Sequence, residues 1–220
     1  MKNNKKYKLI IFDIDGTLTN IENPWKYIHD YCNTWHKNAA VYKEAFGTEN
    51  ITYHEFCKLE VLHWKGLKVD KIYEIFKKVK AVKNLHKSLA ELKMLEFELI
   101  AISSGLQFVP QILELEKYFD KVFHNEIFHK NGILSGEVKI TVNHTKIDIL
   151  DEYLKNKNIS YDEIIFVGDG DNDIALAKIV GYSIAFNSKS EKLNKIASCV
   201  INHSDFDFLK EYLVEISKQN

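Results

Sequence analysis

Two groups of aspartates each follow an apolar run of the sequence. Asp13 and Asp15, in "DIDGT", come directly after "LIIF", and Asp169, Asp171 and Asp173, in "GDGDND", come after "EIIFV". If both runs are strands of one parallel sheet, their carboxyl ends meet at the same edge, and these carboxylates share a small volume. Two carboxylates about 4 Å apart repel each other by ~4 kcal/mol at an effective dielectric constant of about 20. The two groups therefore predict a compensating cation, and hard oxygen ligands favour Mg²⁺.

Simpler interpretations account for only part of this pattern. A turn or helix N-cap explains Asp173, which precedes the helix-like run "IALAKIV", but it does not explain two acidic groups at two strand ends. The run "DGDNDIALAKIV" begins with the aspartate spacing of a calcium-binding EF-hand loop. However, Ile174 stands where that loop needs glycine, and Val180 stands where it needs glutamate. The glycine-rich nucleotide motifs G-x-G-x-x-G and G-x-x-x-x-G-K-S/T do not occur in the sequence.

The spacing of the first pair suits covalent hydrolysis of a phosphate ester. On an extended chain Asp13 and Asp15 point to the same side, so one carboxylate can attack while the other transfers a proton. Gly16 permits a close turn whose backbone N–H groups can bind an anion. The hydroxyl of Ser103, after "ELIAI", can donate to a phosphate oxygen, and a lysine together with Mg²⁺ would balance the phosphoryl charge. The nine histidines form no metal-binding pattern, and we assign no site to them.

Apolar runs and helix-like spacings alternate along the chain and determine where these residues lie. Short apolar runs bounded by turn residues predict buried parallel strands. These runs are 9–12, 98–102, 163–168, 182–186 and 199–201. Apolar residues three and four positions apart predict helices over 82–95, 147–154 and 208–216. The alternation predicts an α/β fold with a doubly wound, Rossmann-like parallel sheet, whose ligands bind at the carboxyl ends of the strands.

Residues 20–81 interrupt this alternation, because they have helix-like spacing and no strand-like run. We expect a helical insertion over the end of the first strand. Its aromatic residues are expected in the core of the insertion rather than beside a ligand. They are Trp25, Tyr31, Trp35, Phe46, Phe56 and Trp64. A smaller insertion follows the second strand, where Asn131-Gly132 between apolar runs predicts a β-hairpin.

Composition limits the classes of function. The 220 residues, 45 % of them hydrophobic, suit one α/β domain with a large insertion. Thirty basic and 31 acidic residues give a net charge of −1, which predicts neither a nucleic-acid partner nor a membrane partner. No apolar stretch approaches the ~20 residues of a membrane span, and we expect "MKNNKKYK" to be a solvated tail. Three separated cysteines favour a cytoplasmic protein, and every basic residue is lysine.

With these residues in place, the sequence resembles the haloacid dehalogenase superfamily, and within it the phosphoserine-phosphatase-like branch. Four motifs are similar in order and spacing over nearly the whole chain: "DIDGT", "AISSG", Lys146 in "NHTKIDIL", and "VGDGDND". The resemblance implies that Asp13 is the nucleophile that forms an aspartyl-phosphate and that Asp15 is the general acid and base. It also implies a Mg²⁺ site formed by Asp13, the backbone carbonyl of Asp15, and Asp169, with Asp173 in support.

The same resemblance implies a set of phosphate- and substrate-binding residues. They are Ser103, Ser104, Gly105, Lys146 and Asn172. Ser104 stands where the branch commonly has glycine, which narrows the expected pocket. The acid at Asp15 favours phosphomonoester hydrolysis, because dehalogenases lack it and transport ATPases have Lys-Thr-Gly-Thr after the nucleophile.

The resemblance also implies two domains. Residues 20–81 correspond to a helical cap domain, and residues 1–19 and 82–220 correspond to the core domain. Such a cap closes over the substrate, excludes water from the first step and selects the leaving group.

The cap residues leave the substrate open. Glu22 falls where phosphoserine phosphatases hold the ammonium group of the substrate, although an acid early in a helix is an equally good interpretation. The arginine with which their cap binds the serine carboxylate has no counterpart, because the chain has no arginine and Glu60 stands near that place. Lys58 or Lys65 is the expected substitute, without the bidentate geometry of arginine.

The predicted function is Mg²⁺-dependent hydrolysis of a small phosphomonoester by a cytoplasmic monomer or homodimer, with phosphoserine as a candidate substrate. Two alternatives stay open. A phosphotransferase or mutase would pass the phosphoryl group to a second substrate instead of water. A regulatory binding protein would keep the fold without turnover, but the complete set of motif residues favours an enzyme.

Overall fold

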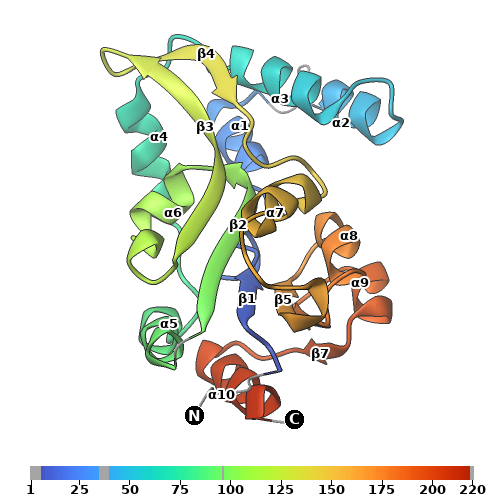
Figure 1. Cartoon of the computed structure of the whole chain (residues 1–220). Helices are drawn as coiled ribbons and strands as arrows, with labels where there is room; N and C mark the ends of the chain where they lie inside the picture. Colours follow the sequence, from blue (N-terminus) through green and yellow to red (C-terminus); the bar gives the residue numbers. More distant parts are fainter. Residues whose placement is uncertain (1–5, 35–39, 96, 219–220) are drawn as a thin grey trace.

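A seven-stranded sheet forms the centre of the molecule (Figure 1). The computed structural model describes residues 6–34, 40–95 and 97–218, so Trp35 and most of the expected N-terminal tail lie outside the described residues. The strands are β1 (Leu9–Phe12), β2 (Glu98–Leu106), β3 (Lys121–Lys130), β4 (Ile133–Lys139), β5 (Ile164–Gly168), β6 (Tyr182–Phe186) and β7 (Cys199–Ile201). Their order is β4-β3-β2-β1-β5-β6-β7, and only the β3–β4 pair is antiparallel. The expected doubly wound, mostly parallel α/β sheet is confirmed.

Helices cover both faces of this sheet. Successive side chains of β1 alternate between the faces, so Ile10 and Phe12 enter one hydrophobic cluster and Leu9 and Ile11 enter the other. Three helices pack on the first face: α5 (Leu85–Met94), α6 (Phe108–Ile112) and α10 (Phe206–Lys218). The second face is covered by α7 (Ile147–Leu154), α8 (Ile174–Ala177) and α9 (Glu191–Ile196). Among the described residues, none of the helices has the length and apolar character of a membrane span.

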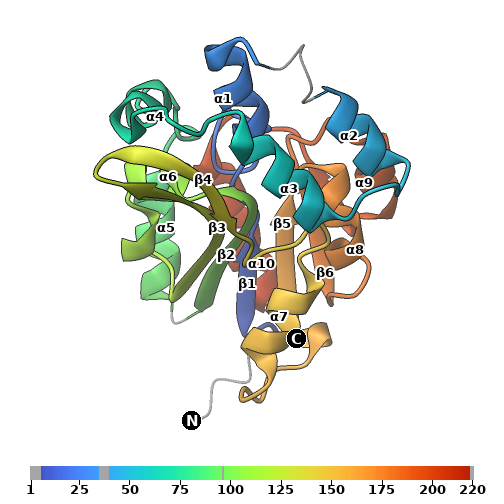
Figure 2. The same cartoon turned by 90° about the horizontal axis from the view of Figure 1, so that it is seen from above.

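Four helices occupy the segment between β1 and α5. They are α1 (Pro24–Cys32), α2 (Ala40–Gly47), α3 (Tyr53–Leu62) and α4 (Val69–Phe76). The Asn23 side chain caps α1 by accepting a hydrogen bond from the Lys26 N–H, and Thr52 and Glu55 form a capping box that starts α3. Seen from above, α3 passes in front of β5, whereas α4 lies to one side, next to α6 (Figure 2).

The β3–β4 hairpin supports this helical segment. Asn131 and Gly132 both have positive φ, at 52° and 76°, as the predicted two-residue turn requires. Beyond the sheet, the hairpin pairs with the chain between α3 and α4. The Val69 N–H donates to the Gly132 carbonyl at 2.8 Å, and the Leu134 N–H donates to the Leu67 carbonyl at 2.9 Å. The hairpin therefore ties the helical segment to the edge of the sheet.

The aromatic residues of the segment divide into buried and exposed ones. Trp25 and Trp64 are buried and pack with ring centroids 5.7 Å apart, as expected for core residues. Tyr31 is 51 % exposed, so its predicted place in the core is wrong. Because each residue turns the helix by about 100°, Tyr31 falls off the face of α1 that Trp25 and Ile28 share.

Candidate active site

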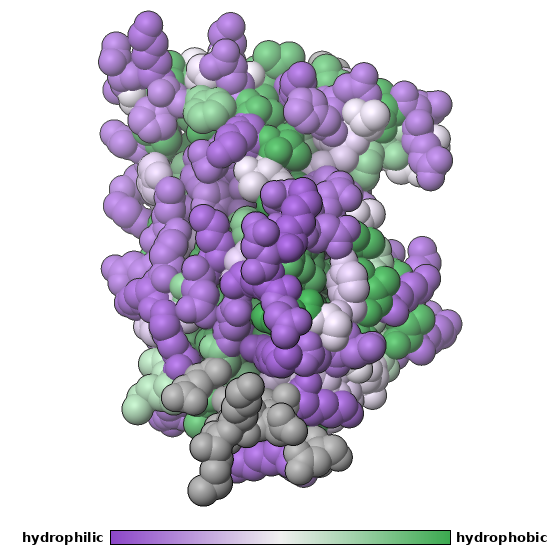
Figure 3. Space-filling model, viewed as in Figure 1, coloured by the Kyte–Doolittle hydropathy of each residue, from purple (hydrophilic) through white to green (hydrophobic). Residues whose placement is uncertain are grey.

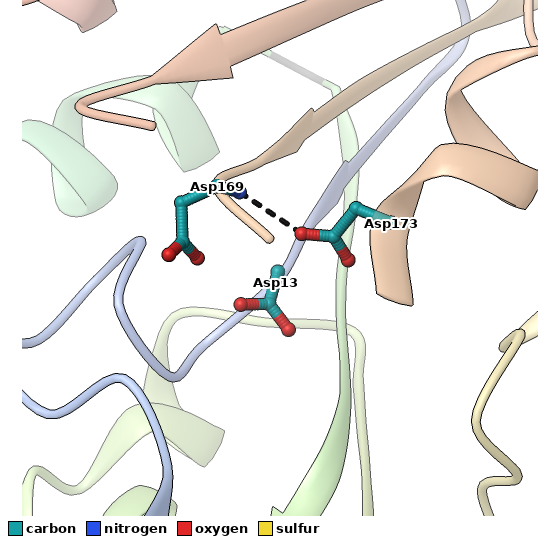
Figure 4. Close-up of side chains that lie close together, drawn as sticks. All are labelled: Asp13, Asp169 and Asp173. Atoms are coloured by element: carbon teal, nitrogen blue, oxygen red, sulfur yellow. Dashed lines mark hydrogen bonds between the residues drawn. The ribbon is translucent and has the colours of Figure 1, made fainter. Parts of the chain in front are cut away.

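The ends of β1 and β5 bring three aspartates together (Figure 4). Asp13 follows β1, and its N–H donates to the Val167 carbonyl of β5 at 2.8 Å, so the sheet pairing extends to this residue. Asp169 follows β5, and Asp173 ends a 3-10 turn over Asp171–Asp173. Asp13, Asp169 and Asp173 each offer one carboxylate oxygen, and these oxygens lie within 4.8 Å of one another. Neighbouring parallel strands thus bring together three of the five aspartates that the sequence predicts in one cluster. Asp171 departs from the prediction, because its side chain is exposed and lies 3.7 Å from Lys192 Nζ.

Lys146 supplies a buried positive charge to this cluster. It precedes α7 with a φ of 64°, and the Asn143 side chain accepts its N–H in the same turn. Its Nζ, which is fully buried, donates to the carboxylate of Asp13 and to that of Asp173, the latter at 2.6 Å. Burial alone would lower the pKa of Lys146, but the two carboxylates outweigh it and raise that pKa. The lysine is therefore charged at neutral pH.

Asp173 holds the loop and the lysine in position. One of its oxygens accepts the N–H groups of Asp169 and Gly170, at 2.9 Å and 3.0 Å, and the other accepts Lys146. An added Cβ at Gly168 would lie 2.4 Å from the Asp173 carboxylate, so only glycine fits the end of β5. Both oxygens of Asp173 are thus already engaged. Asp13 Oδ1 accepts Lys146, but Asp13 Oδ2 has only a long contact, 3.4 Å, with the Thr17 hydroxyl. This oxygen and Oδ2 of Asp169, whose Oδ1 accepts Thr17, are the better placed for a metal ion.

Asp15 lies against the end of β2. The Ser103 hydroxyl donates to its Oδ2 and accepts the Gly105 N–H at 2.8 Å. The other oxygen of Asp15, Oδ1, is buried and has no hydrogen-bond partner among the described residues. A buried acceptor without a partner is costly. This oxygen is therefore the atom of Asp15 that is available to exchange a proton with a bound molecule.

Burial and mutual repulsion raise the pKa values of three of these carboxyl groups. The pKa of Asp13 rises to about 6, because burial outweighs the neighbouring Lys146. Burial and the charge of Asp13 raise the pKa of Asp15 to about 7 and that of Asp169 to about 9. A bound divalent cation would offset both the burial and the mutual repulsion that raise these pKa values. The chemistry of the donor set therefore fits Mg²⁺.

A cavity of about 400 Å³ lies between these strand ends and the helices α1, α2 and α3. Figure 3 shows the outline indented between the part that contains α2 and α3 and the part that contains α8 and α9. Most of the predicted site residues line this cavity, while the buried Ser103, Lys146 and Asp173 lie beneath its wall. The predicted lining residues are Asp13, Asp15, Glu22, Ser104, Gly105, Asp169 and Asn172.

The charged residues that the sequence assigns to substrate binding are arranged differently from the prediction. Glu22 lies at the mouth of the cavity and forms an ion pair with Lys189. Neither Lys58 nor Lys65 lines the cavity; among the described residues, its lysines are Lys43 and Lys189. Lys58 lies on the outer side of α3, about 140° round the helix from Tyr53, which lines the cavity. The expectation that Lys58 or Lys65 binds a substrate carboxylate is therefore wrong.

Sequence reasoning missed an aromatic and acidic wall of the cavity. Phe46 and Phe56 line the cavity, which the prediction did not expect, although Phe56 also packs against the core cluster, and Tyr53 lies beside them. Glu60 follows on the same face of α3, because positions 53, 56 and 60 are three and four residues apart. That spacing was the signal in the sequence, but it is equally typical of core residues.

The Ser104 carbonyl joins the helical segment to the sheet. It accepts hydrogen bonds from Trp25 Nε1 at 3.1 Å, from the Tyr53 hydroxyl at 2.8 Å and from Asn125 Nδ2 at 2.9 Å. Trp25 belongs to α1, Tyr53 to α3 and Asn125 to β3. The end of β2 is thus fixed both by the helical segment and by the neighbouring strand β3.

A doubly wound sheet with aspartates after β1 and β5 and a lysine buried between them defines an enzyme of phosphoryl chemistry. The model of the haloacid dehalogenase-like hydrolases matches residues 7–181, and the chain belongs to this family. The expected class, a phosphatase of the haloacid dehalogenase superfamily, is confirmed.

Several relatives share nearly the whole chain. The phosphoserine phosphatase of Methanocaldococcus jannaschii is 26 % identical over 94 % of this chain and 98 % of its own length. The phosphoserine phosphatase of Archaeoglobus fulgidus is 30 % identical over 88 % of this chain, but only 56 % of its own length is matched. A solved structure of a phospho-aspartyl intermediate analogue of phosphoserine phosphatase superposes with a TM-score of 0.76 at 25 % identity, covering 94 % of this chain and 99 % of that one.

Proposed function

We propose that this protein is a Mg²⁺-dependent phosphatase that hydrolyses a small phosphate monoester through an aspartyl-phosphate on Asp13. One observation carries the proposal: Asp13 meets a buried ammonium group on one side and a second acidic residue, Asp169, on the other, at the floor of the cavity. A dianionic phosphate can approach a carboxylate only where positive charge is provided, here by Lys146 and by the Mg²⁺ ion that Asp169 would help to hold.

In this proposal Asp13 and Asp169, with the backbone carbonyl of Asp15, hold the Mg²⁺ ion. The bound ion would neutralise charge on the phosphoryl oxygens. Thr17 supports both carboxylates, since its hydroxyl lies 2.9 Å from Asp169 Oδ1 and 3.4 Å from Asp13 Oδ2. These contacts leave Asp13 oriented toward the cavity for attack on phosphorus.

Asp15 is proposed as the general acid and base. With a pKa raised to about 7, its carboxyl group can hold a proton for the leaving alcohol at neutral pH and then accept one from water. Ser103 fixes the orientation of Asp15. Ser104, Gly105 and Asn172 line the part of the cavity where the phosphoryl group would lie.

We further propose that residues 20–81 act as the cap and that residues 1–19 and 82–220 form the core. The cavity lies between the two parts, so the cap would exclude water from the first step and contact the leaving group. Phosphoserine is the substrate that the names of the relatives suggest, and it is the first candidate to assay.

Asp13→Asn tests the proposal. Amide nitrogen in place of the nucleophilic oxygen should lower kcat by at least ~10³-fold for any phosphate monoester, while circular dichroism and the melting temperature show a folded protein. Asp30→Asn, at an exposed ion pair with Lys26 on α1, is the matched control and should keep full activity. Phosphate release in Mg²⁺ and in EDTA is the measurement.

The assay also separates the alternatives. Substrate loss that exceeds phosphate release in the presence of an alcohol would indicate a phosphotransferase. Activity retained by Asp13→Asn, or activity that EDTA leaves unchanged, would contradict the proposal.

A further inference from the structure

Glu60 is a buried carboxylate in the wall of the cavity on the cap side. Its side chain is fully buried and lines the cavity, and its Oε2 lies 2.7 Å from Nε2 of the equally buried His29. Its second oxygen, Oε1, has no hydrogen-bond partner among the described residues. A buried acceptor of this kind is normally paired, so an unpaired one at a cavity wall indicates a missing donor.

Aromatic rings from α2 and α3 line the cavity beside Glu60. Phe46 stacks on Phe56 with ring centroids 5.5 Å apart, and Tyr53 lies 5.7 Å from Phe46. The hydroxyl of Tyr53 already donates to the Ser104 carbonyl, so it is not the donor that Glu60 lacks. Ring faces beside a carboxylate attract cations, and ammonium and quaternary ammonium groups are bound in this way.

Among the described residues that line the cavity, the lysines Lys43 and Lys189 are both exposed, so a substrate carboxylate would have no buried cation comparable to the buried Glu60. The chain has no arginine. Of the cavity lysines that the structure describes, Lys189 is paired with Glu22 at the mouth and Lys43 is exposed on α2, while Lys146 is held under the wall by Asp13 and Asp173. A substrate carboxylate placed beside Glu60 would bring two carboxyl groups together at a buried position, which is unfavourable.

We propose that the substrate is the phosphate ester of an amino alcohol that has no carboxylate. The inference rests on the proposed phosphatase function. The phosphoryl group lies at Asp13, and the cationic nitrogen lies between Glu60 Oε1 and the rings of Phe46, Tyr53 and Phe56. In the reaction a bond forms between phosphorus and an Asp13 carboxylate oxygen as the ester O–P bond breaks, and the leaving oxygen takes the proton of Asp15. Water, giving a proton back to Asp15, then attacks phosphorus and breaks the bond to Asp13, so that the products are the free amino alcohol and inorganic phosphate.

The first test uses the unmodified protein with Mg²⁺ and compares kcat/KM for four esters: phosphoethanolamine, phosphocholine, phosphoserine and 2-hydroxyethyl phosphate. The last keeps a hydrogen-bond donor but lacks the positive charge. We expect at least one of the two cationic esters to exceed both phosphoserine and 2-hydroxyethyl phosphate by ~10-fold or more, because a site built for one polar group discriminates against its absence. Phosphoserine or 2-hydroxyethyl phosphate equal to or better than both would overturn the inference.

A generic ester, p-nitrophenyl phosphate, distinguishes failure of the substrate inference from failure of the phosphatase proposal. Mg²⁺-dependent hydrolysis of this ester without a preference for the cationic esters would overturn the substrate inference and leave the phosphatase proposal standing. Absence of hydrolysis of all five esters would overturn both.

Variants locate the preference at Glu60. Glu60→Gln should lower the ratio of kcat/KM for phosphoethanolamine to that for 2-hydroxyethyl phosphate by ~10-fold, because the charge that selects the cation is removed. Glu74→Gln, an exposed residue of α4, should keep the ratio. If loss of the contact with His29 prevents folding of Glu60→Gln, Phe56→Leu is the second variant. It should lower the ratio of kcat/KM for phosphocholine to that for 2-hydroxyethyl phosphate. An unchanged ratio in the folded variant would contradict the assignment.

Discussion

At the scale of single residues, three carboxyl groups with raised pKa values connect the stability of the protein to pH and Mg²⁺. The pKa values of Asp13, Asp15 and Asp169 rise from 3.8 to about 6, 7 and 9. Between pH 4 and pH 9 the folded protein therefore holds protons that the unfolded chain has released. This contribution to stability is complete below about pH 4 and is lost as the pH rises through the folded-state values.

We therefore predict that, in EDTA, this group of carboxyls lowers the melting temperature as the pH is raised from about 5.5 to 8.5. Mg²⁺ should raise the melting temperature more at the higher pH, because the carboxylates that would bind it are then ionised. Thermal unfolding at both pH values, with and without Mg²⁺, measures the effect. Asp169→Asn should remove most of the Mg²⁺ increment. An equal increment at both pH values, or one that Asp169→Asn leaves intact, would exclude this linkage.

The sequence predicts some of these residues better than others. Asp13, Asp15 and Ser103 could be placed together because each follows an apolar run, and the ends of neighbouring parallel strands converge. Lys146 could be singled out only by resemblance, since one lysine among thirty has no local signature. Resemblance put Glu60 near the place of the substrate-binding arginine, but its contact with His29 could not be predicted, because His29 lies on another helix and the contact depends on how α1 and α3 pack.

At the scale of elements, the end of β2 determines how closely its backbone approaches Asp15. The sequence predicts a strand over 98–102, but β2 continues to Leu106, through the polar residues after Ile102. Its pairing with β3 shifts register between Ile102 and Leu106. This irregularity turns Ser103 and Gly105 toward Asp15. An apolar run alone could not predict the extension, because pairing with β3 maintains it.

Gly105→Ala tests this fit. The added methyl group would lie 2.3 Å from Asp15 Oδ2 and 2.7 Å from Pro24 Cγ, so Asp15 or the start of α1 must move. A displacement of about 1 Å in a catalytic group costs ~100-fold in rate, and we expect a loss of that order in kcat/KM. Steady-state kinetics on a folded variant provide the measurement.

Gly47→Ala is the matched control for this substitution. Gly47 ends α2 and has no atom within 4 Å of its built Cβ, so kcat/KM should stay within about 2-fold of the unmodified protein. A Gly105→Ala variant as active as this control would show that Asp15 does not depend on the close approach of β2.

At the scale of the whole molecule, one hydrophobic cluster joins the helical segment to the sheet. Trp25, Trp64 and Phe76 of the segment belong to the same cluster of buried residues as Phe12 of β1 and Leu213 of α10. Phe76 stacks on Phe108 of α6, with ring centroids 5.4 Å apart, and so provides a direct link between the two parts. Packing of this extent couples the unfolding of the two parts.

We predict that the segment and the sheet unfold together. All three tryptophans, at positions 25, 35 and 64, lie within residues 20–81, so tryptophan fluorescence reports on the segment, while far-ultraviolet circular dichroism reports on the whole chain. The urea transitions followed by the two signals should coincide. Leu213→Ala removes a fully buried side chain on the opposite part of the cluster, and it should lower the free energy of unfolding by about 2 to 5 kcal/mol in both signals.

The exposed Leu62 provides the control for this last prediction. Its side chain is 55 % exposed on α3, so Leu62→Ala should change the free energy of unfolding by less than about 0.5 kcal/mol, although it lies in the segment that carries the tryptophans. If the fluorescence transition came at lower urea than the circular dichroism transition, or if Leu213→Ala shifted only the latter, the segment would unfold on its own. Coincident shifts would show instead that a substitution in α10, far along the chain, destabilises the helical segment that lines the cavity as much as it destabilises the sheet.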